Sequence, residues 1–186
     1  MTAVWIAVGV AVVLVLYFIG IYNGLVRRRN EMQNTWAQID VQLKRRHDLI
    51  PNLVEAVKGY MTHEKGTLEA VIQARNAAAN AQGPIQAGAA EGLLGALLGR
   101  IFVLAEDYPE LKANTNFLAL QEELTSTENR ITFARQAYND AATRYNNARE
   151  VFPAVLISGG FERSDLFEIE RPSERQLPQA DFGSRD

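Results

Sequence analysis

The sequence contains no cysteine, two histidines and no excess of basic residues. Without cysteine the chain has no disulfide, no thiol nucleophile, no cysteine-ligated metal and no lipoprotein attachment residue. Nineteen lysines and arginines stand against 22 aspartates and glutamates, so the net charge is -3. Nucleic-acid binding requires an excess of cations to replace counterions, so we expect no nucleic-acid partner.

The motifs of common catalytic and metal sites are also missing. His47 and His63 are preceded three positions earlier by Lys44 and Tyr60, so neither completes the Glu-x-x-His motif of di-metal carboxylate bundles. No glycine-rich phosphate loop follows a predicted strand, and there is no Gly-x-Ser-x-Gly nucleophile elbow. We therefore expect a binding and assembly protein that is not an enzyme, with no catalytic residue, no metal and no cofactor.

One long hydrophobic run lies at the N-terminus. No side chain in residues 2–26 carries a charge, and residues 4–22 are almost wholly apolar, about the length of a membrane-spanning helix. A cleaved signal peptide is the alternative, but the basic head and the small-residue cleavage site are not visible. Arg27, Arg28 and Arg29 follow directly, and the positive-inside rule places such a flank in the cytoplasm. We expect a single-pass protein with its N-terminus outside, the lipid bilayer being its first partner.

A first apolar repeat begins at Trp36 and advances by alternating steps of three and four, the pattern of a helix with one face against partner helices. The repeat continues past Pro51, and Arg46 occupies one position at which the repeat would place an apolar residue. It predicts one helix over residues 30–79, kinked at residues 47–51 because proline removes a hydrogen-bond donor. A turn at that point, with Asp48 as its N-cap, is the alternative.

A second repeat over residues 117–152 makes ten steps of three and four without a fault. It predicts a long helix that Pro153 ends, with a seam facing partner helices. Arg46, Glu64 and Glu128 fall on or near the seams of the two repeats. Polar residues at such positions indicate a partly buried ion pair or a device that sets the alignment of the helices.

Between the two repeats the sequence predicts a loop over residues 80–88 and a short apolar helix over residues 89–108, closed or bent by Pro109. Glycine recurs there at steps of four, three and four, at Gly88, Gly92, Gly95 and Gly99. Each costs a helix about 1 kcal/mol relative to alanine, so we expect close backbone approach in return. Tight packing inside a bundle explains these glycines; a self-association or lipid-touching surface is the alternative.

The chain thus divides into three parts: a transmembrane anchor over residues 1–26, a helical bundle over residues 27–153 and a C-terminal extension over residues 154–186. We expect an all-α fold, with an N-terminal transmembrane helix followed by an antiparallel long-helix bundle. The extension is rich in charge and is expected to be flexible or docked on the bundle or on a neighbouring subunit. The side chains that would dock are Phe161, Leu166, Phe167 and Ile169.

Residues 36–54, WAQIDVQLKRRHDLIPNLV, resemble the signature of the LemA family. Residues 106–114, EDYPELKAN, and two later Tyr-Asn pairs agree with it, and the resemblance covers residues 22 to about 161. The motif positions are Trp36, Asp40, Arg45, Arg46, Asp48, Pro51, Asn52, Tyr108, Pro109, Asn114, Tyr138, Asn139, Tyr145 and Asn146.

The resemblance implies a bacterial, membrane-anchored antiparallel helical bundle with no established enzymatic activity. Lipoprotein members of the family would have their bundle outside the cytoplasm, so here the arginines decide the topology: the cytoplasmic (inner) membrane, with the bundle in the cytoplasm. A family member in magnetosome membranes implies a role in membrane organisation. Many members have a cysteine for lipid attachment where Ile21 stands in this chain.

Residues and resemblance together predict a scaffold or assembly protein that forms a homo-oligomer and binds other membrane-associated proteins. One alternative is a membrane-remodelling or lipid-binding module, in which residues 88–102 lie as an amphipathic helix in the interface between membrane and water. The other is a non-catalytic accessory subunit of a membrane protease or transporter.

Overall fold

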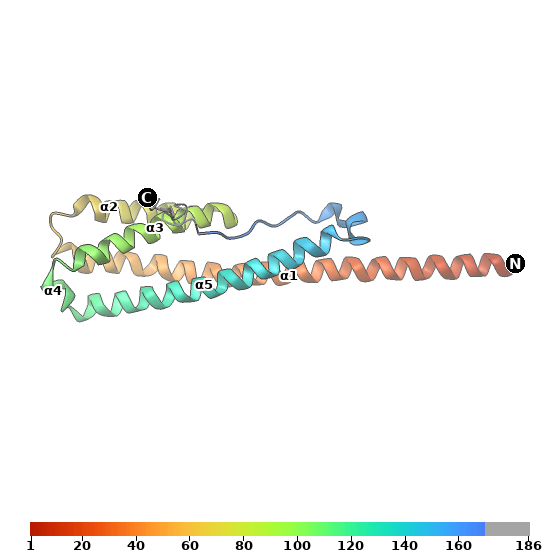
Figure 1. The fold of residues 1–186 in the computed structure, drawn as a ribbon, viewed down its shortest axis with the longest axis horizontal. Coiled ribbons are helices and arrows are strands. Elements are labelled where there is room, and N and C mark those ends of the chain that lie inside the picture. Colours follow the sequence, from red (N-terminus) through yellow and green to blue (C-terminus); the bar gives the residue numbers. More distant parts are fainter. Residues whose placement is uncertain (170–186) are drawn as a thin grey trace, which may run out of the picture. The chain divides into compact units, whose positions relative to one another are not determined.

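The computed structural model describes residues 1–169, which form an all-α fold without a β-strand in that range (Figure 1). An apolar N-terminal helix is followed by helices that pack on one another, which confirms the predicted fold class. The elements are α1 (Thr2–Lys58), α2 (Lys65–Asn80), α3 (Gly83–Ala105), α4 (Pro109–Lys112), α5 (Thr115–Glu150) and the 3-10 turns η1 (Ala154–Leu156) and η2 (Ser158–Gly160).

Helix α1 is a single element of 57 residues that contains Pro51. A proline has no N–H for the carbonyl four residues earlier, which is the carbonyl of His47. Arg75 Nε, from α2, donates a hydrogen bond to that oxygen at 3.1 Å, so the freed acceptor keeps a partner. The prediction that the helix passes through Pro51 is confirmed, and the alternative turn capped by Asp48 is wrong.

The prediction of one helix over residues 30–79 is wrong at its C-terminal part. Helix α1 ends at Lys58, and a turn leads into α2. Gly59 follows the last helical residue and favours a break, because glycine has a high conformational entropy to lose in a helix. In the turn Met61 is fully buried, and its N–H donates to Val57 O at 2.9 Å.

The predicted loop over residues 80–88 is also wrong, because only Ala81 and Gln82 lie outside helices in that range. Gly83 has a φ of 73°, a left-handed conformation that glycine adopts at little cost, and it makes the turn. Pro84 lies in the first turn of α3, where a missing N–H does no harm. The proline and glycine that suggested a loop therefore start a helix.

Pro109 does not close the apolar helix, because α3 ends four residues earlier and Pro109 begins α4. Asn114 then caps α5: its Oδ1 accepts the N–H of Asn116 at 2.9 Å and that of Phe117 at 3.2 Å. Both ends of α5 lie within two residues of the predicted long helix, which is confirmed.

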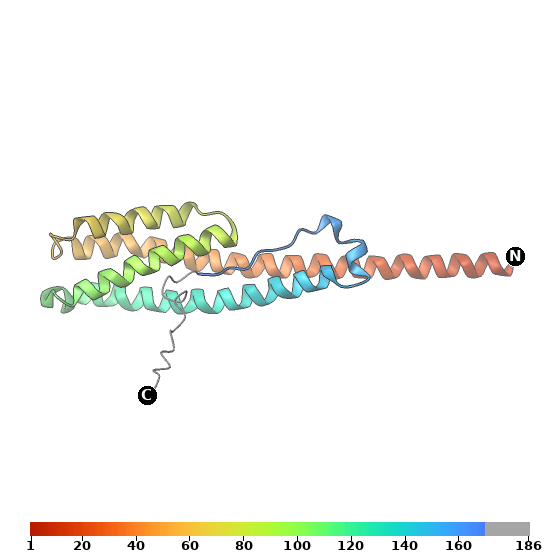
Figure 2. The same cartoon turned by 45° about the horizontal axis from the view of Figure 1, so that its top comes forward.

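The described residues form two compact units, residues 1–46 with 122–167 and residues 47–121 with 168–169. In the first unit α1 and α5 run antiparallel, and residues 161–167 return along them (Figure 2). The predicted seam of α5 is buried at Leu124, Thr127, Ile131, Tyr138, Ala141 and Tyr145. Phe152, the last position of the repeat, lies beyond the helix and is 78% exposed.

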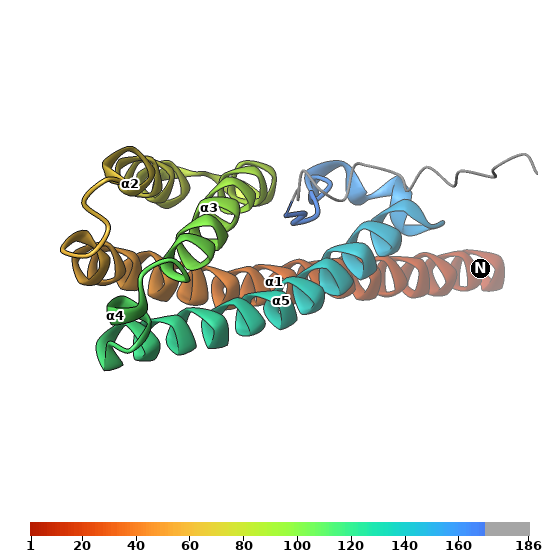
Figure 3. The same cartoon turned by 60° about the vertical axis from the view of Figure 1, so that its left-hand side comes forward.

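The second unit contains the end of α1, helices α2, α3 and α4 and the beginning of α5. Helices α2 and α3 are antiparallel neighbours joined by the two-residue connection, and α4 leads from α3 to α5 (Figure 3). Its core contains the buried side chains of Ile50, Leu53, Val57, Val71, Leu94, Ile101 and Leu111.

Two helices are long and apolar enough to cross a membrane by length and composition. In α1 the most apolar stretch has no buried side chain, and every residue from 1 to 17 is exposed. In α3 the corresponding stretch is 39% buried. The N-terminal part of α1 therefore has the features of a membrane anchor or a signal sequence.

Candidate functional site: a backbone clamp on α5

Two Tyr-Asn pairs of the family motif stand seven residues apart on α5, at positions 138–139 and 145–146. Seven residues make nearly two helical turns, so the pairs share one face of the helix. We call these four side chains the clamp. The segment 161–167, which we call the strap, lies against this face and runs in the opposite direction to α5.

Each clamp asparagine binds both main-chain groups of one strap residue. Asn146 Nδ2 donates to Ser164 O at 2.8 Å, and Asn146 Oδ1 accepts the Ser164 N–H at 3.0 Å. Asn139 makes the same two bonds with Phe167, at 3.1 Å and 2.9 Å. A carboxamide offers a donor and an acceptor side by side, so each asparagine takes the place of a neighbouring β-strand.

The clamp tyrosines bind two further carbonyls of the strap. Tyr145 Oη donates to Glu162 O and Tyr138 Oη donates to Asp165 O, each at 2.8 Å. Burial raises the pKa of both phenols above the ordinary value of a tyrosine. The phenols therefore keep the protons that these hydrogen bonds require.

The repeat of the helix matches the repeat of the strap. Seven residues of α-helix rise about 10.5 Å, and three residues of extended chain span about 10 Å. The tyrosines bind strap residues 162 and 165, and the asparagines bind residues 164 and 167, so both partners advance by three. Each seven-residue step along α5 thus corresponds to a three-residue step along the strap main chain.

Phe161 fixes the N-terminal end of the strap and is 3% exposed. It belongs to a buried cluster with Leu25, Tyr145 and Ala154. Tyr22 meets its ring edge-on, with ring centroids 5.3 Å apart, and the guanidinium of Arg29 lies 5.3 Å from the ring centroid. The strap is therefore tied to α1 as well as to α5.

Phe167 fixes the other end and is fully buried. Trp36 contacts both Phe167 and Tyr138 edge-on, with centroid separations of 5.6 Å and 5.2 Å. Sequence reasoning missed Arg149, whose Nε donates to Phe161 O at 2.9 Å. Leu166, which was expected to dock with the two phenylalanines, is 37% exposed.

The predicted ion pair exists between Arg46 and Glu128, with Nη1 and Oε2 2.8 Å apart. The side chain of Arg46 is 6% exposed and that of Glu128 is 35% exposed. A second pair, Arg45 with Glu123 at 2.7 Å, is about half exposed on both sides. Glu64 takes no part in the buried pair; its Oε2 accepts the Thr67 hydroxyl at 3.2 Å.

The remaining motif positions lie mostly at the surface. Asp40, Asp48, Pro51, Asn52 and Pro109 are exposed, and Tyr108 is half-buried. Although Asp40 is exposed as a residue, neighbouring side chains shield its carboxyl partly from water, which raises its pKa. Of the flanking arginines, Arg27 and Arg28 are exposed.

The four glycines of α3 differ in their surroundings. Gly88 and Gly92 are buried, Gly95 is half-buried and Gly99 is exposed. A Cβ at Gly88 would collide with the main-chain oxygen of Glu168, so this glycine permits close backbone approach. A Cβ at Gly99 would meet nothing within 4 Å.

Sequence reasoning also missed a buried pair in the second unit, in which His47 Nε2 lies 2.5 Å from Glu91 Oε1. Glu91 is 1% exposed on the apolar, glycine-rich helix α3. The sequence signal for this pair was Glu91, the single acidic residue of the apolar helix α3, because a buried carboxylate requires a partner. Among residues 1–169 no group of three or more His, Asp or Glu side chains could hold a metal ion.

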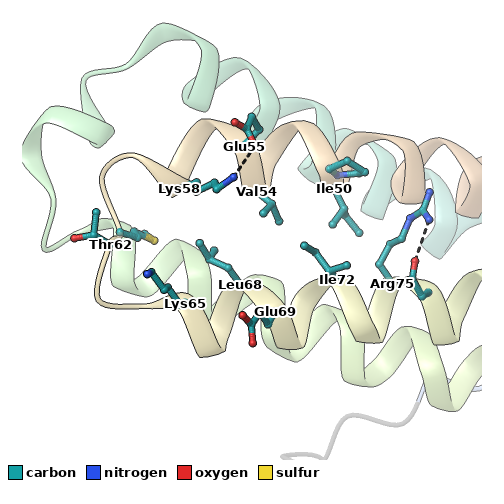
Figure 4. Close-up of a pocket in the computed structure, with 13 residues that line it drawn as sticks. Ile50, Val54, Glu55, Lys58, Thr62, Lys65, Leu68, Glu69, Ile72 and Arg75 are labelled. Atoms are coloured by element: carbon teal, nitrogen blue, oxygen red, sulfur yellow. Dashed lines mark hydrogen bonds and ion pairs between the residues drawn. The ribbon is translucent and has the colours of Figure 1, made fainter.

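An apolar cavity of about 600 Å³ lies between the end of α1 and α2 (Figure 4). Ile50 and Val54 from α1 point toward Leu68 and Ile72 from α2 across it. Charged side chains surround these walls: Glu55, Lys58, Lys65, Glu69 and Arg75.

Known proteins resemble this chain over most of its length. It is 27% identical over 156 residues to Protein LemA of Metamycoplasma hominis, which covers 82% of this chain and 68% of that protein. It is 26% identical over 180 residues to Magnetosome protein MamQ of Magnetospirillum gryphiswaldense and to Magnetosome protein MamQ 2 of Paramagnetospirillum magneticum, covering 82% of this chain and 66% of each. The chain thus spans about two thirds of the length of these relatives. The model of the LemA family matches residues 35–182, and the chain belongs to this family.

Proposed function

We propose that this protein is a membrane-anchored scaffold that self-associates and binds protein partners at the bilayer through its helical units. The observation that carries the proposal is the unburied apolar stretch at the start of α1, continuous with the part of the same helix that enters the core. A helix that is apolar on all sides is stable in hydrocarbon, because its main-chain groups are bonded internally.

A cleaved signal peptide is the competing explanation for residues 1–26. Leu25 is 1% exposed in the cluster with Tyr145 and Phe161, and the ring of Tyr22 also contacts Phe161. Cleavage near residue 26 would remove both side chains from the folded unit. The burial of Leu25 and the ring contact of Tyr22 support a retained anchor.

The flanking arginines support an orientation with the bundle in the cytoplasm. Arg27 and Arg28 are exposed where the apolar stretch ends, so they can lie among headgroups on the cytoplasmic side. The N-terminus would then lie outside the membrane.

An open apolar groove of about 500 Å³ in the first unit supports protein docking. Val41 from α1 and Phe133 from α5 line it and are 63% and 72% exposed. Ala134 and Ala137 line it as well, and small side chains allow a partner helix to approach closely.

Carbonate extraction and fusion reporters test the anchor and its orientation. Full-length protein should stay in the membrane pellet at high pH, and a C-terminal alkaline phosphatase fusion should be inactive. The triple variant Arg27→Gln, Arg28→Gln, Arg29→Gln should raise phosphatase activity, because it removes the cytoplasmic flank. Full-length protein in the soluble fraction without detergent would refute the anchor, and an active fusion of the unmodified chain would refute the orientation.

Light scattering of the full-length protein in detergent tests self-association. We expect a mass above that of one chain, and Phe133→Asp should reduce it by placing a charge in the groove. Thr132→Asp adds the same charge at the exposed neighbouring residue and should leave the mass unchanged. A monomeric mass at all concentrations would contradict this part of the proposal.

A second candidate function, binding of an amphipathic lipid molecule, is favoured by the cavity between α1 and α2. Its volume lies in the range of about 300–1,000 Å³ found for small-molecule sites, and its walls are apolar. Lys65 at the rim would attract an anionic headgroup. A fluorescent long-chain fatty acid should bind saturably to the full-length protein and lose binding in Ile72→Trp, which fills the cavity.

The matched control is Ile85→Trp on α3, an exposed residue outside the cavity, which should bind the probe as the unmodified protein does. Equal binding by both tryptophan variants would show that the probe binds to the detergent or to another surface of the protein. It would refute lipid binding in this cavity.

A further inference from the structure

We propose that the clamp on α5 also binds the strap of a second copy of this chain, so that neighbouring copies are joined by exchanging residues 161–167. The inference rests on the proposed self-association and names the segment that carries it. The bound ligand is an extended segment with large apolar side chains at its first and seventh positions and a small polar residue midway.

All contacts that hold the strap are made by residues 161–167 themselves. The clamp binds main-chain groups of residues 162, 164, 165 and 167, and two buried phenylalanines occupy the ends. Glu162, Arg163 and Asp165 are exposed. A second copy presents the identical segment, so exchange replaces every contact with its equivalent, which is the condition for domain swapping.

The connection between α5 and the strap ends in a pair of glycines that can redirect the chain. Gly159 and Gly160 are exposed, and a Cβ at either position would meet nothing within 4 Å. They lie in the single turn η2, which the hydrogen bond from the Phe161 N–H to Ser158 O closes at 2.8 Å, and glycine has the widest range of backbone angles. The path of the whole connection, residues 151–160, can therefore change while residues 161–167 keep their contacts.

The energetic balance between the closed and the exchanged form depends on local concentration. Folding back within one chain is favoured by a short connection, at an effective concentration in the millimolar range. Two copies held in one bilayer by their N-terminal helices meet at a raised local concentration, so exchange competes with folding back. The two forms differ only in the path of residues 151–160.

Shortening the connection tests the proposal. A full-length variant lacking Gly159 and Gly160 cannot easily return the strap to its own clamp, but its strap still reaches a neighbouring one. We expect light scattering in detergent to show a shift toward dimer, relative to a variant with alanine at both positions and an unchanged length. A deletion variant with the same mass distribution as this control would overturn the proposal.

Clamp mutations separate strap exchange from other modes of association. Asn139→Ala with Asn146→Ala, added to the deletion variant, should return the dimer to monomer because the exchanged strap loses four hydrogen bonds. A dimer that persists in this variant but dissociates with Phe133→Asp would overturn strap exchange and leave the proposed scaffold function standing. Loss of all self-association in the unmodified chain would instead refute the proposed function.

A synthetic strap measures recognition by the clamp directly. Full-length protein with Phe161→Ala and Phe167→Ala keeps the clamp but has a weakened strap, so it should bind a labelled peptide of residues 161–168, FERSDLFE, with a saturable rise in anisotropy. N-methylation of the peptide at Ser164 removes a donor to the clamp and should weaken binding about tenfold or more.

N-methylation at Asp165 is the matched control, since within residues 1–169 the N–H of Asp165 makes no hydrogen bond with α5. It should leave affinity near that of the unmodified peptide. Two results would overturn the proposal: no saturable binding, or equal binding by all three peptides. Either would show that the clamp does not recognise the main chain of a strap from another molecule.

Discussion

Asn146 and Ser164 exchange two hydrogen bonds, with the side chain of one binding both main-chain groups of the other at 2.8 Å and 3.0 Å. Asn146 is 7% exposed, so its carboxamide has little access to water and depends on Ser164 for its partners. Helix α5 therefore binds the extended strap through paired hydrogen bonds to the strap main chain, as the edge strand of a β-sheet would.

Asn146→Ala should lower the free energy of unfolding by about 1–3 kcal/mol, because it leaves the part-buried N–H and carbonyl of Ser164 without these partners. Thermal unfolding in detergent followed by circular dichroism measures the change. Asn147→Ala, at the exposed neighbouring position of the same helix, should stay within about 0.5 kcal/mol of the unmodified protein. Equal effects of the two substitutions would show that the hydrogen bonds to the strap do not contribute.

Gly88→Ala and Gly99→Ala should change stability in opposite directions. A Cβ at Gly88 collides with the main-chain oxygen of Glu168 and must displace that segment, so the variant should be destabilised. A Cβ at Gly99 meets nothing within 4 Å on the same helix, so alanine should stabilise by about 0.5–1 kcal/mol. Thermal midpoints of the two variants, compared in one detergent, decide whether the close approach at Gly88 exists.

Removal of a carboxylate should matter more at Glu128 than at Glu123. Glu128→Ala removes the carboxylate paired with the guanidinium of Arg46, which is 6% exposed, and should cost about 1–3 kcal/mol. Glu123→Ala removes the partner of Arg45 from a pair about half exposed to water and should cost at most about 1 kcal/mol. If added salt weakened both pairs alike, the buried character of the first would be disproved.

Attachment of the strap should weaken at alkaline pH. Burial, and to a lesser extent the charge of Asp165, raises the pKa of Tyr138 above its ordinary value of 10.0, while the hydrogen bond with Ser164 lowers it. The folded protein therefore binds this proton more tightly than the unfolded chain, so the stabilisation is complete below pH 10 and is lost as the pH rises through the folded pKa. Burial shifts the pKa of Tyr145 in the same direction.

Thermal midpoints measured from about pH 8 to pH 11 test this dependence. The unmodified protein should lose stability above pH 10, and Tyr138→Phe should be less stable at neutral pH and lose less on titration. An identical slope for the two proteins would exclude Tyr138 as a source of the effect.

Helix α5 and the passage of α1 through Pro51 were predictable because a seam of alternating three and four steps is a local property of the sequence. The end of α1 and the start of α3 were not. Proline and glycine are tolerated or disfavoured according to what surrounds them. His47 O finds a donor in Arg75, so α1 continues through Pro51; Gly83 and Pro84 fit the first turn of α3, so no loop forms there.

By itself the sequence determined the all-α class, the apolar N-terminal stretch, the seam of α5 and membership of the LemA family, because each is written in consecutive residues. Tertiary structure alone decided which side chains meet. It joins His47 to Glu91 across 44 positions and Asn139 to Phe167 across 28. The physical reason is that a hydrogen bond depends on two groups brought within about 3 Å, and no periodicity along the chain specifies which distant segment supplies the second group.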